Sequence, residues 1–227
     1  MAENFPLNPT RADVAVAPNR VLRNTYALLA LSLVPTVLGA IVGVQINFSF
    51  MRDSPFLGLM AFLAIAFGFF YAIEKNKNSS IGVAILLAFT FFMGLMLTGL
   101  IQKTLTFANG STLIATAVGG TSLVFFGMAT IAGTIKRDIS HMGRFLMMGV
   151  LVLLAAIVAN IFLQIPALTL AILVAIIAVC SALLVYDINR IITGGETNYI
   201  TATLHIYLDV YNIFSSLLSL LGITNSD

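Results

Sequence analysis

The sequence comprises 227 residues, of which 59% are hydrophobic and only 9% are charged, with a formal net charge of +2. Soluble domains carry about 25% charged residues, so this composition excludes an ordinary soluble enzyme and a disordered chain. The net charge is too small for a nucleic-acid-binding surface, and the single cysteine, Cys180, excludes a disulfide framework and a cysteine-rich zinc site.

A mean hydropathy of +1.04 indicates one membrane-embedded bundle. A helix needs about 20 apolar residues to cross a bilayer, and continuous rather than alternating apolar runs predict helices without strands. The long run over 145–186 is divided at Gln164-Ile165-Pro166, because proline ends or kinks a helix. We therefore predict an all-α integral membrane protein whose seven spans cover 24–44, 55–73, 80–101, 111–133, 145–163, 167–187 and 202–222.

Lysine and arginine residues gather on one side of the predicted membrane. Because basic residues favour cytoplasmic loops, we expect a cytoplasmic N-terminal tail, 1–23, a membrane domain, 24–222, and a short C-terminal tail outside, 223–227. Segment 1–20 has no apolar stretch of signal-peptide type, so the first span is expected to remain as an uncleaved anchor. The odd-numbered loops hold only Arg52 and Lys103, whereas the N-terminal tail and the even-numbered loops hold Arg11, Arg20, Arg23, Lys75, Lys77, Lys136, Arg137, Arg144 and Arg190.

Small residues recur at helical spacing in several spans, as at Gly39 and Gly43 in the first. Small residues allow helices to approach closely in lipid. We expect this face to pack within the bundle, and a homodimer contact through the two glycines is the alternative.

The last predicted span carries one polar stripe. Its members are spaced three or four residues apart, which places them on one helical face. Polar stripes in membrane helices face protein or water, so this span is predicted to be a central or pore-lining helix. The stripe consists of His205, Asp209, Asn212, Ser216 and Ser219.

Asp209 lies about 10 Å into the membrane at 1.5 Å per residue, where an ionised carboxylate costs at least about 2.5 kcal/mol. It therefore needs a proton, a cation or a charged partner. If it approaches Asp187, at the end of the sixth span, the two carboxyls can share a proton or hold a transient Ca²⁺. The alternative is separate pairing, of Asp187 with Arg190 and of Asp209 with His205.

Other polar positions have simpler explanations. We expect Cys180 to be a small buried residue, Asn160 to form a hydrogen bond between helices, and Gly194-Gly195 to end a helix. Lys136-Arg137-Asp138 is expected to anchor the topology, and a cytoplasmic docking patch is the alternative. Hydrolase, nucleotide-binding and metalloprotease motifs are absent from the sequence, so an enzyme is not expected.

Several stretches resemble the Bax inhibitor-1 family, and the resemblance covers nearly the whole chain. The run Ala159 to Pro166 and the run Gly194 to Ile200 look closest to its bacterial branch, the modulators of the FtsH membrane protease. The other stretches that carry the resemblance are Asn19 to Tyr26, Ile135 to Ser140, Val185 to Ile188 and Tyr207 to Phe214.

The resemblance implies seven helices, with the last enclosed by the other six. It also implies an aspartate pair that acts as a pH-sensitive latch on a calcium leak, and Asp187 and Asp209 fall on these two positions. Leak-type members carry an arginine at the end of the second helix, where this sequence has Lys75. Lys75 and Arg190 are therefore the candidate basic partners of the pair.

Two functions follow from the resemblance. The first is a pH-sensitive calcium leak in the bacterial inner membrane, with Ca²⁺ as the permeant ion and no bound cofactor. The alternative is a modulator that binds FtsH and limits its proteolysis without ion flux. Both have the lipid bilayer as their surroundings.

Overall fold

The computed structural model describes residues 11–46 and 55–225, and within these ranges the chain is helical without strands. Seven of its helical segments are long and apolar enough to cross a membrane, which confirms the predicted spans. The third span is formed by two helices that are separated at Leu97. The helices are α1 (Arg11–Gln45), α2 (Pro55–Asn76), α3 (Ser80–Met96), α4 (Thr98–Leu105), α5 (Gly110–Thr134), the 3₁₀ turn η1 (Ser140–Met142), α6 (Gly143–Leu163), α7 (Pro166–Ile192) and α8 (Tyr199–Thr224).

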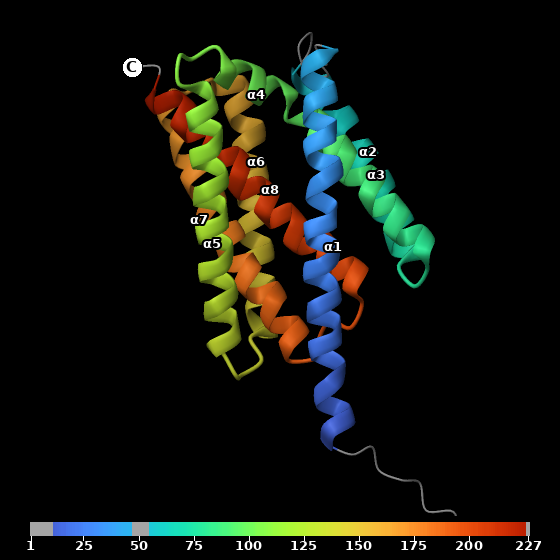
Figure 1. The fold of residues 1–227 in the computed structure, drawn as a ribbon. Coiled ribbons are helices and arrows are strands. Elements are labelled where there is room, and N and C mark those ends of the chain that lie inside the picture. The colour runs from blue at the N-terminus through green and yellow to red at the C-terminus, as the bar shows by residue number, and fades with distance from the viewer. Residues whose placement is uncertain (1–10, 47–54, 226–227) are drawn as a thin grey trace, which may run out of the picture.

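Helix α8 forms the centre of the bundle (Figure 1). It packs against α1, α2, α3, α4, α5 and α7, whereas α6 packs chiefly against α7. None of the residues 198–223 is exposed, including the polar residues of α8. The prediction of a central last helix is confirmed.

The predicted break between the fifth and sixth spans is confirmed at Gln164. This residue adopts the left-handed conformation, with a φ of 51°, and Pro166 occupies the first turn of α7. The Asn160 side chain completes the turn, since its oxygen accepts a hydrogen bond from the Ile165 amide at 3.1 Å. Proline is favoured at the start of a helix because the backbone N–H groups of the first turn have no acceptor within the helix. The N–H group that proline lacks therefore costs no hydrogen bond there.

The end of α7 follows the expected glycine pattern. Gly194 has a φ of +81°, a conformation that glycine adopts without steric cost. The Gly195 and Glu196 amides both donate to the Arg190 carbonyl, at 2.8 and 3.0 Å. These bonds reverse the chain and direct it into α8.

Close packing of α1 on α3 and α4 explains the small residues of the first span. A Cβ atom at Gly39 would lie 2.2 Å from the Phe91 carbonyl oxygen, and one at Gly43 would lie 1.9 Å from the Thr98 hydroxyl. This face is therefore occupied within the chain. Bundle packing is confirmed, and the homodimer contact through these two glycines is wrong.

The two ends of the bundle differ in charge. One end, here called the basic end, is formed by the loops 77–79, 135–142 and 193–198 and carries most of the lysine and arginine residues. Helix α1 begins at Arg11 and extends past the other helices at this end (Figure 1). The second half of the predicted N-terminal tail is thus helical.

Candidate functional site: the polar face of α8

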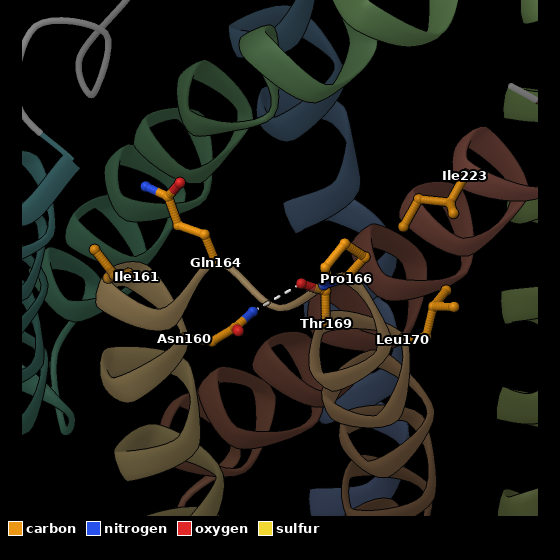
Figure 2. A pocket seen from close by; sticks show the side chains of 7 residues that line it. All are labelled: Asn160, Ile161, Gln164, Pro166, Thr169, Leu170 and Ile223. Atoms are coloured by element: carbon orange, nitrogen blue, oxygen red, sulfur yellow. Dashed lines mark hydrogen bonds between the residues drawn. The ribbon is translucent and has the colours of Figure 1, made fainter.

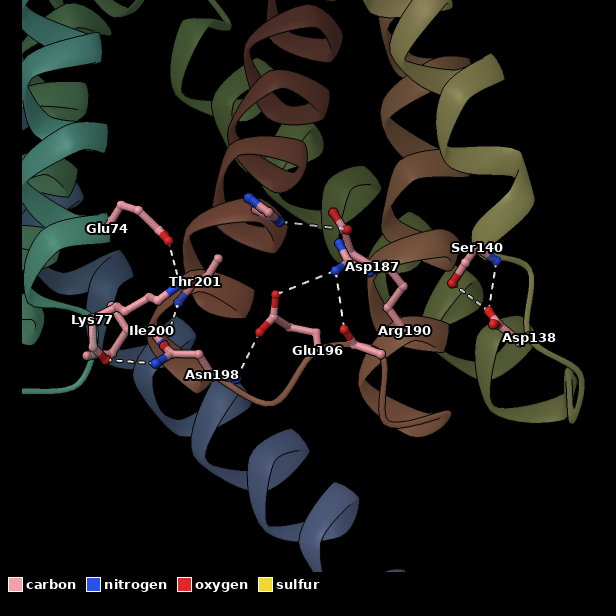
Figure 3. A network of polar contacts seen from close by, with 12 residues as sticks. Glu74, Lys77, Asp138, Ser140, Asp187, Arg190, Glu196, Asn198, Ile200 and Thr201 are labelled. Carbon is pink, nitrogen blue, oxygen red and sulfur yellow. Dashed lines mark hydrogen bonds and ion pairs between the residues drawn. The ribbon is translucent and has the colours of Figure 1, made fainter.

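The start of α8 is fixed by Asn198. Its side-chain oxygen accepts hydrogen bonds from the amides of Ile200 and Thr201, at 2.9 and 3.1 Å, which caps the helix. Its side-chain nitrogen donates to the Lys77 carbonyl at 2.9 Å (Figure 3) and to the Asn78 side chain, also at 2.9 Å. The cap therefore joins the first turn of α8 to the loop between α2 and α3.

Lys77 holds this loop on its other side, through an ion pair with Glu74 one turn earlier (Figure 3). The hydrogen bond to Glu74 raises the pKa of Lys77 above its usual value. The loop between α2 and α3 is therefore held by the Lys77–Glu74 ion pair as well as by the hydrogen bonds from Asn198.

The polar stripe of α8 faces the interior along most of its length. Asp209 and Ser216 are buried, and His205, Asn212 and Ser219 are half-buried. The Ser219 hydroxyl donates to the Ser215 carbonyl at 2.7 Å, a local bond that satisfies it within the helix.

Asp209 lies at the centre of this stripe and is only 5% exposed. Its Oδ2 atom is buried and has no hydrogen-bond partner within the described part of the chain. The Thr201 hydroxyl, two turns earlier on the same face, is also buried without a partner there. Unpaired buried oxygen atoms are costly in a low-dielectric interior, so these two atoms are suited to accept a proton donor or a cation.

Asp187 contacts His205 at the basic end of the stripe. The Asp187 Oδ1 atom lies 3.8 Å from His205 Nδ1, and this ion pair requires a protonated imidazole (Figure 3). Asp187 also acts on Asp209 electrostatically, but no hydrogen bond joins the two described carboxyls. A histidine from the stripe itself is thus the direct partner of Asp187.

The basic residues suggested by the sequence have other positions. Arg190 contacts Glu196 at 3.8 Å and donates to the Gly195 carbonyl at 3.3 Å (Figure 3), and its guanidinium group also lies over the Tyr186 ring. Lys75 is exposed in the last turn of α2. Neither residue forms an ion pair with Asp187 or Asp209 among the described residues, and neither of the separate pairings considered from the sequence is present.

A pocket lies near the opposite end of the bundle, where α6, α7 and α8 meet (Figure 2). Its volume is about 480 Å³. The Asn160 side chain donates to the Thr169 hydroxyl at 2.7 Å, which confirms the predicted hydrogen bond between helices. The pocket is lined by Asn160, Ile161, Gln164, Pro166, Thr169, Leu170 and Ile223.

The candidate cation site consists of two carboxylates rather than a full ligand set. Groups of three or more histidine, cysteine, aspartate or glutamate residues able to hold a metal do not occur in the described ranges. Cys180 is buried and free, as expected. The transient cation contact at Asp187 and Asp209 therefore stays a prediction from the sequence.

Two buried polar residues that support this region were not identified from the sequence. Asn189 fixes the loop between α5 and α6 through three hydrogen bonds. The Tyr207 hydroxyl lies 2.8 Å from the Thr36 hydroxyl and so joins α8 to α1. Asn189 directly follows the stretch Val185 to Ile188, and Tyr207 is two residues before Asp209. Their closeness in sequence to the two aspartates was the signal that could have identified them.

The sequence was compared with protein families and curated proteins. The family model described as "Inhibitor of apoptosis-promoting Bax1" matches residues 18–226. The chain is 42% identical over 212 residues to "Modulator of FtsH protease YccA" of Escherichia coli strain K12, which covers 93% of this chain and 94% of that protein. It is also 39% identical to an uncharacterized protein of Pseudomonas aeruginosa, over 94% of this chain and 95% of that protein.

A further relative of 42% identity, from Escherichia coli O6:H1, is named an inner membrane protein and is matched over 93% of this chain and 94% of its own length. The family match, the identity across nearly the whole length and the seven spans agree with one another. The chain belongs to the Bax inhibitor-1 family of membrane proteins.

Proposed function

We propose that this chain is a pH-sensitive cation leak of the bacterial inner membrane, with Ca²⁺ as the permeant ion. The observation that supports this most directly is the Asp209 carboxyl, which is buried at the centre of the bundle with an unpaired oxygen. A group of this kind inside a membrane domain is usually retained for a proton or an ion, because its burial is costly. The role is a passive conduction step and not a catalysed reaction.

The proposed pathway begins at the basic end and follows the stripe of α8. Asp187 and His205 form its entrance, and Asp209 is the central site. The 3.8 Å contact between Asp187 and His205 is an ion pair only while the imidazole carries a proton, so this entrance depends on protonation. Asn212, Ser216 and Ser219 continue the polar face toward the other end.

Calcium flux into liposomes that contain the purified protein tests this proposal across pH 5 to 8. We expect a pH-dependent flux in the wild type. Asparagine cannot ionise, so Asp187→Asn removes the ion pair with His205 and should abolish the pH dependence, whereas Asp209→Asn should change the flux through the central site. Glu74→Gln, which removes an exposed carboxylate at the same end, is the matched control and should leave the profile unchanged.

Thermal unfolding in detergent distinguishes a gating effect from a folding defect. Asp209→Asn should unfold at the same temperature as the wild type or higher, because a neutral amide costs less to bury than a carboxylate. Absence of flux at every pH from folded wild-type protein would contradict the leak.

The second candidate function is modulation of the membrane protease FtsH without ion flux. Its support is the relative named "Modulator of FtsH protease YccA", which is similar over nearly the whole chain. The extension of α1 beyond the bundle at the basic end provides a surface that a partner outside the membrane could contact (Figure 1).

Co-purification with FtsH and measurement of FtsH substrate turnover test the second function. Removal of residues 2–18, which stops before the membrane span that begins at Asn19, should reduce both the capture of FtsH and the effect on turnover. A scrambled segment of the same length is the control. If FtsH is not captured and turnover is the same with and without the protein, this function is excluded.

A further inference from the structure

The loop between α5 and α6, together with the first turn of α6, presents basic side chains that lack acidic partners. Lys136, Arg137 and Arg144 are all exposed, and none of them forms an ion pair with a carboxylate of the described residues. At the same end of the bundle, Lys77 and Arg190 are paired with Glu74 and Glu196. The charges of this loop are therefore available to an external anion.

The loop is held in one conformation by a side chain beneath it. Asn189 of α7 is fully buried, and its amide nitrogen donates to the carbonyls of Ile135 and Arg137, at 3.1 and 3.3 Å. Its side-chain oxygen accepts a hydrogen bond from the Ile139 amide at 3.3 Å. The backbone that carries the basic residues is thus fixed before any ligand binds, which lowers the cost of ordering on binding.

Asp138, the acidic residue within this loop, is engaged locally. Its Oδ1 atom accepts hydrogen bonds from the Ser140 amide at 2.8 Å and from the Ser140 hydroxyl at 2.6 Å (Figure 3). These two bonds lower the pKa of the Asp138 carboxyl. Asp138 therefore stabilises the turn and leaves the neighbouring basic side chains unpaired.

The position of the loop relative to the spans matches the headgroup layer of a membrane. The fourth span ends at Thr134 and the fifth begins at Ser140, so Lys136 and Arg137 lie in the short connection between two membrane-spanning segments. The Phe145 side chain, next to Arg144, is 74% exposed, and Met148 follows it on α6 with a similar exposure. Basic groups are thus followed directly by an apolar surface that faces lipid.

We propose that Lys136, Arg137 and Arg144 form a binding site for an anionic phospholipid, with the phosphate group on the basic side chains and an acyl chain along Phe145 and Met148. Arginine matches phosphate oxygens with two parallel hydrogen bonds, and lysine adds a point charge. An isolated phosphate would use the basic groups alone, whereas a phospholipid also uses the exposed apolar surface. This site is independent of which proposed function is correct.

Native mass spectrometry of the full chain in detergent tests the site with phosphatidylglycerol and phosphatidylcholine. The wild type should retain phosphatidylglycerol in preference to phosphatidylcholine. The combined variant Lys136→Gln, Arg137→Gln and Arg144→Gln should lose about tenfold or more of this retention, as expected for the removal of three membrane-surface charges. Millimolar inorganic phosphate should not displace the lipid.

A matched control removes three other exposed basic groups from the same end of the bundle. The variant Arg20→Gln, Arg23→Gln and Lys75→Gln changes the net charge equally and should retain phosphatidylglycerol like the wild type. If the two variants lose phosphatidylglycerol retention equally, the retention reflects general electrostatic attraction to the basic end, and the proposal is overturned. It is also overturned if the wild type does not prefer phosphatidylglycerol to phosphatidylcholine.

Unfolding temperatures in phosphatidylcholine alone show whether the loop variant is folded. If it is not, Arg137→Lys with Arg144→Lys replaces it, because these changes keep the charge and remove the two-bond geometry. A reduced preference for phosphatidylglycerol in this second variant supports the site, and an unchanged preference overturns the role of the arginines.

Discussion

The Tyr207 hydroxyl shows how a single polar group connects three helices of this bundle. The residue is 1% exposed, its hydroxyl lies 2.8 Å from the Thr36 hydroxyl of α1, and it donates to the Thr90 carbonyl of α3 at 3.4 Å. Its ring also contacts Phe89. A hydrogen bond between membrane helices contributes only modestly to stability. The bonds of Tyr207 to two neighbouring helices also fix the rotation of α8 about its own axis.

Tyr207→Phe should lower the free energy of unfolding by about 1 kcal/mol, because it removes this hydroxyl and keeps the ring packing. Thermal unfolding in detergent, followed by circular dichroism, measures the change. Tyr71→Phe is the matched control, since Tyr71 is 70% exposed and should have no effect. The interpretation is wrong if both variants unfold at the same temperature.

Individual residues of the site were predicted from the sequence to different degrees. The polar face of the last span was predictable, because a spacing of three or four residues fixes a helical face. The contact between Asp187 and His205 was not, because local spacing suggests only partners on the same helix or adjacent in sequence. Which groups meet across two helices depends on the rotation of α7 relative to α8, which is set by packing.

At the scale of whole helices, backbone contact between α1 and α3 determines the shape of one side of the bundle. A Cβ atom at Gly94 would lie 2.1 Å from the Thr36 carbonyl oxygen and 3.0 Å from the Ala40 amide nitrogen. The atoms in contact belong to the backbone, so they cannot move aside as a flexible side chain can. Any side chain at Gly94 forces the two helices apart.

Gly94→Val should therefore destabilise the fold strongly, by about 3 kcal/mol or more, through overpacking and separation of the helices. The measurement is the fraction of protein that elutes as a folded monodisperse species, together with its unfolding temperature. Gly68→Val is the matched control, because a Cβ atom at this position of α2 has no neighbour within 4 Å. Comparable losses in the two variants would contradict the proposed packing.

The ends of several helices were predictable from single residues. Pro166 marks the start of α7, and Gly194 follows its end, because their backbone preferences are local. The break at Leu97 and the helical state of residues 11–23 were not predicted. The apolar run continues through Leu97, and a polar segment before a span is equally compatible with a helix and with an extended tail.

At the scale of the whole molecule, an odd number of spans places the two described ends of the chain on opposite sides of the membrane. Figure 1 shows the beginning of α1 and the end of α8 at opposite ends of the bundle. The distribution of lysine and arginine predicts that the basic end is cytoplasmic.

Cysteine labelling in intact spheroplasts tests this orientation, and the native cysteine causes little background because Cys180 is buried. We expect Thr224→Cys to react with a membrane-impermeant maleimide added from outside. Ser79→Cys, in the loop between α2 and α3, should react only after lysis. The reverse pattern would place the basic end outside.

The central position of α8 also has a consequence for biosynthesis. Helix α8 fills the centre but follows the other described helices along the chain, so it leaves the ribosome after the first six spans. Until α8 is inserted, the position that it will occupy in the bundle is open to lipid. The native packing of the first six spans therefore forms only after α8 has entered the membrane.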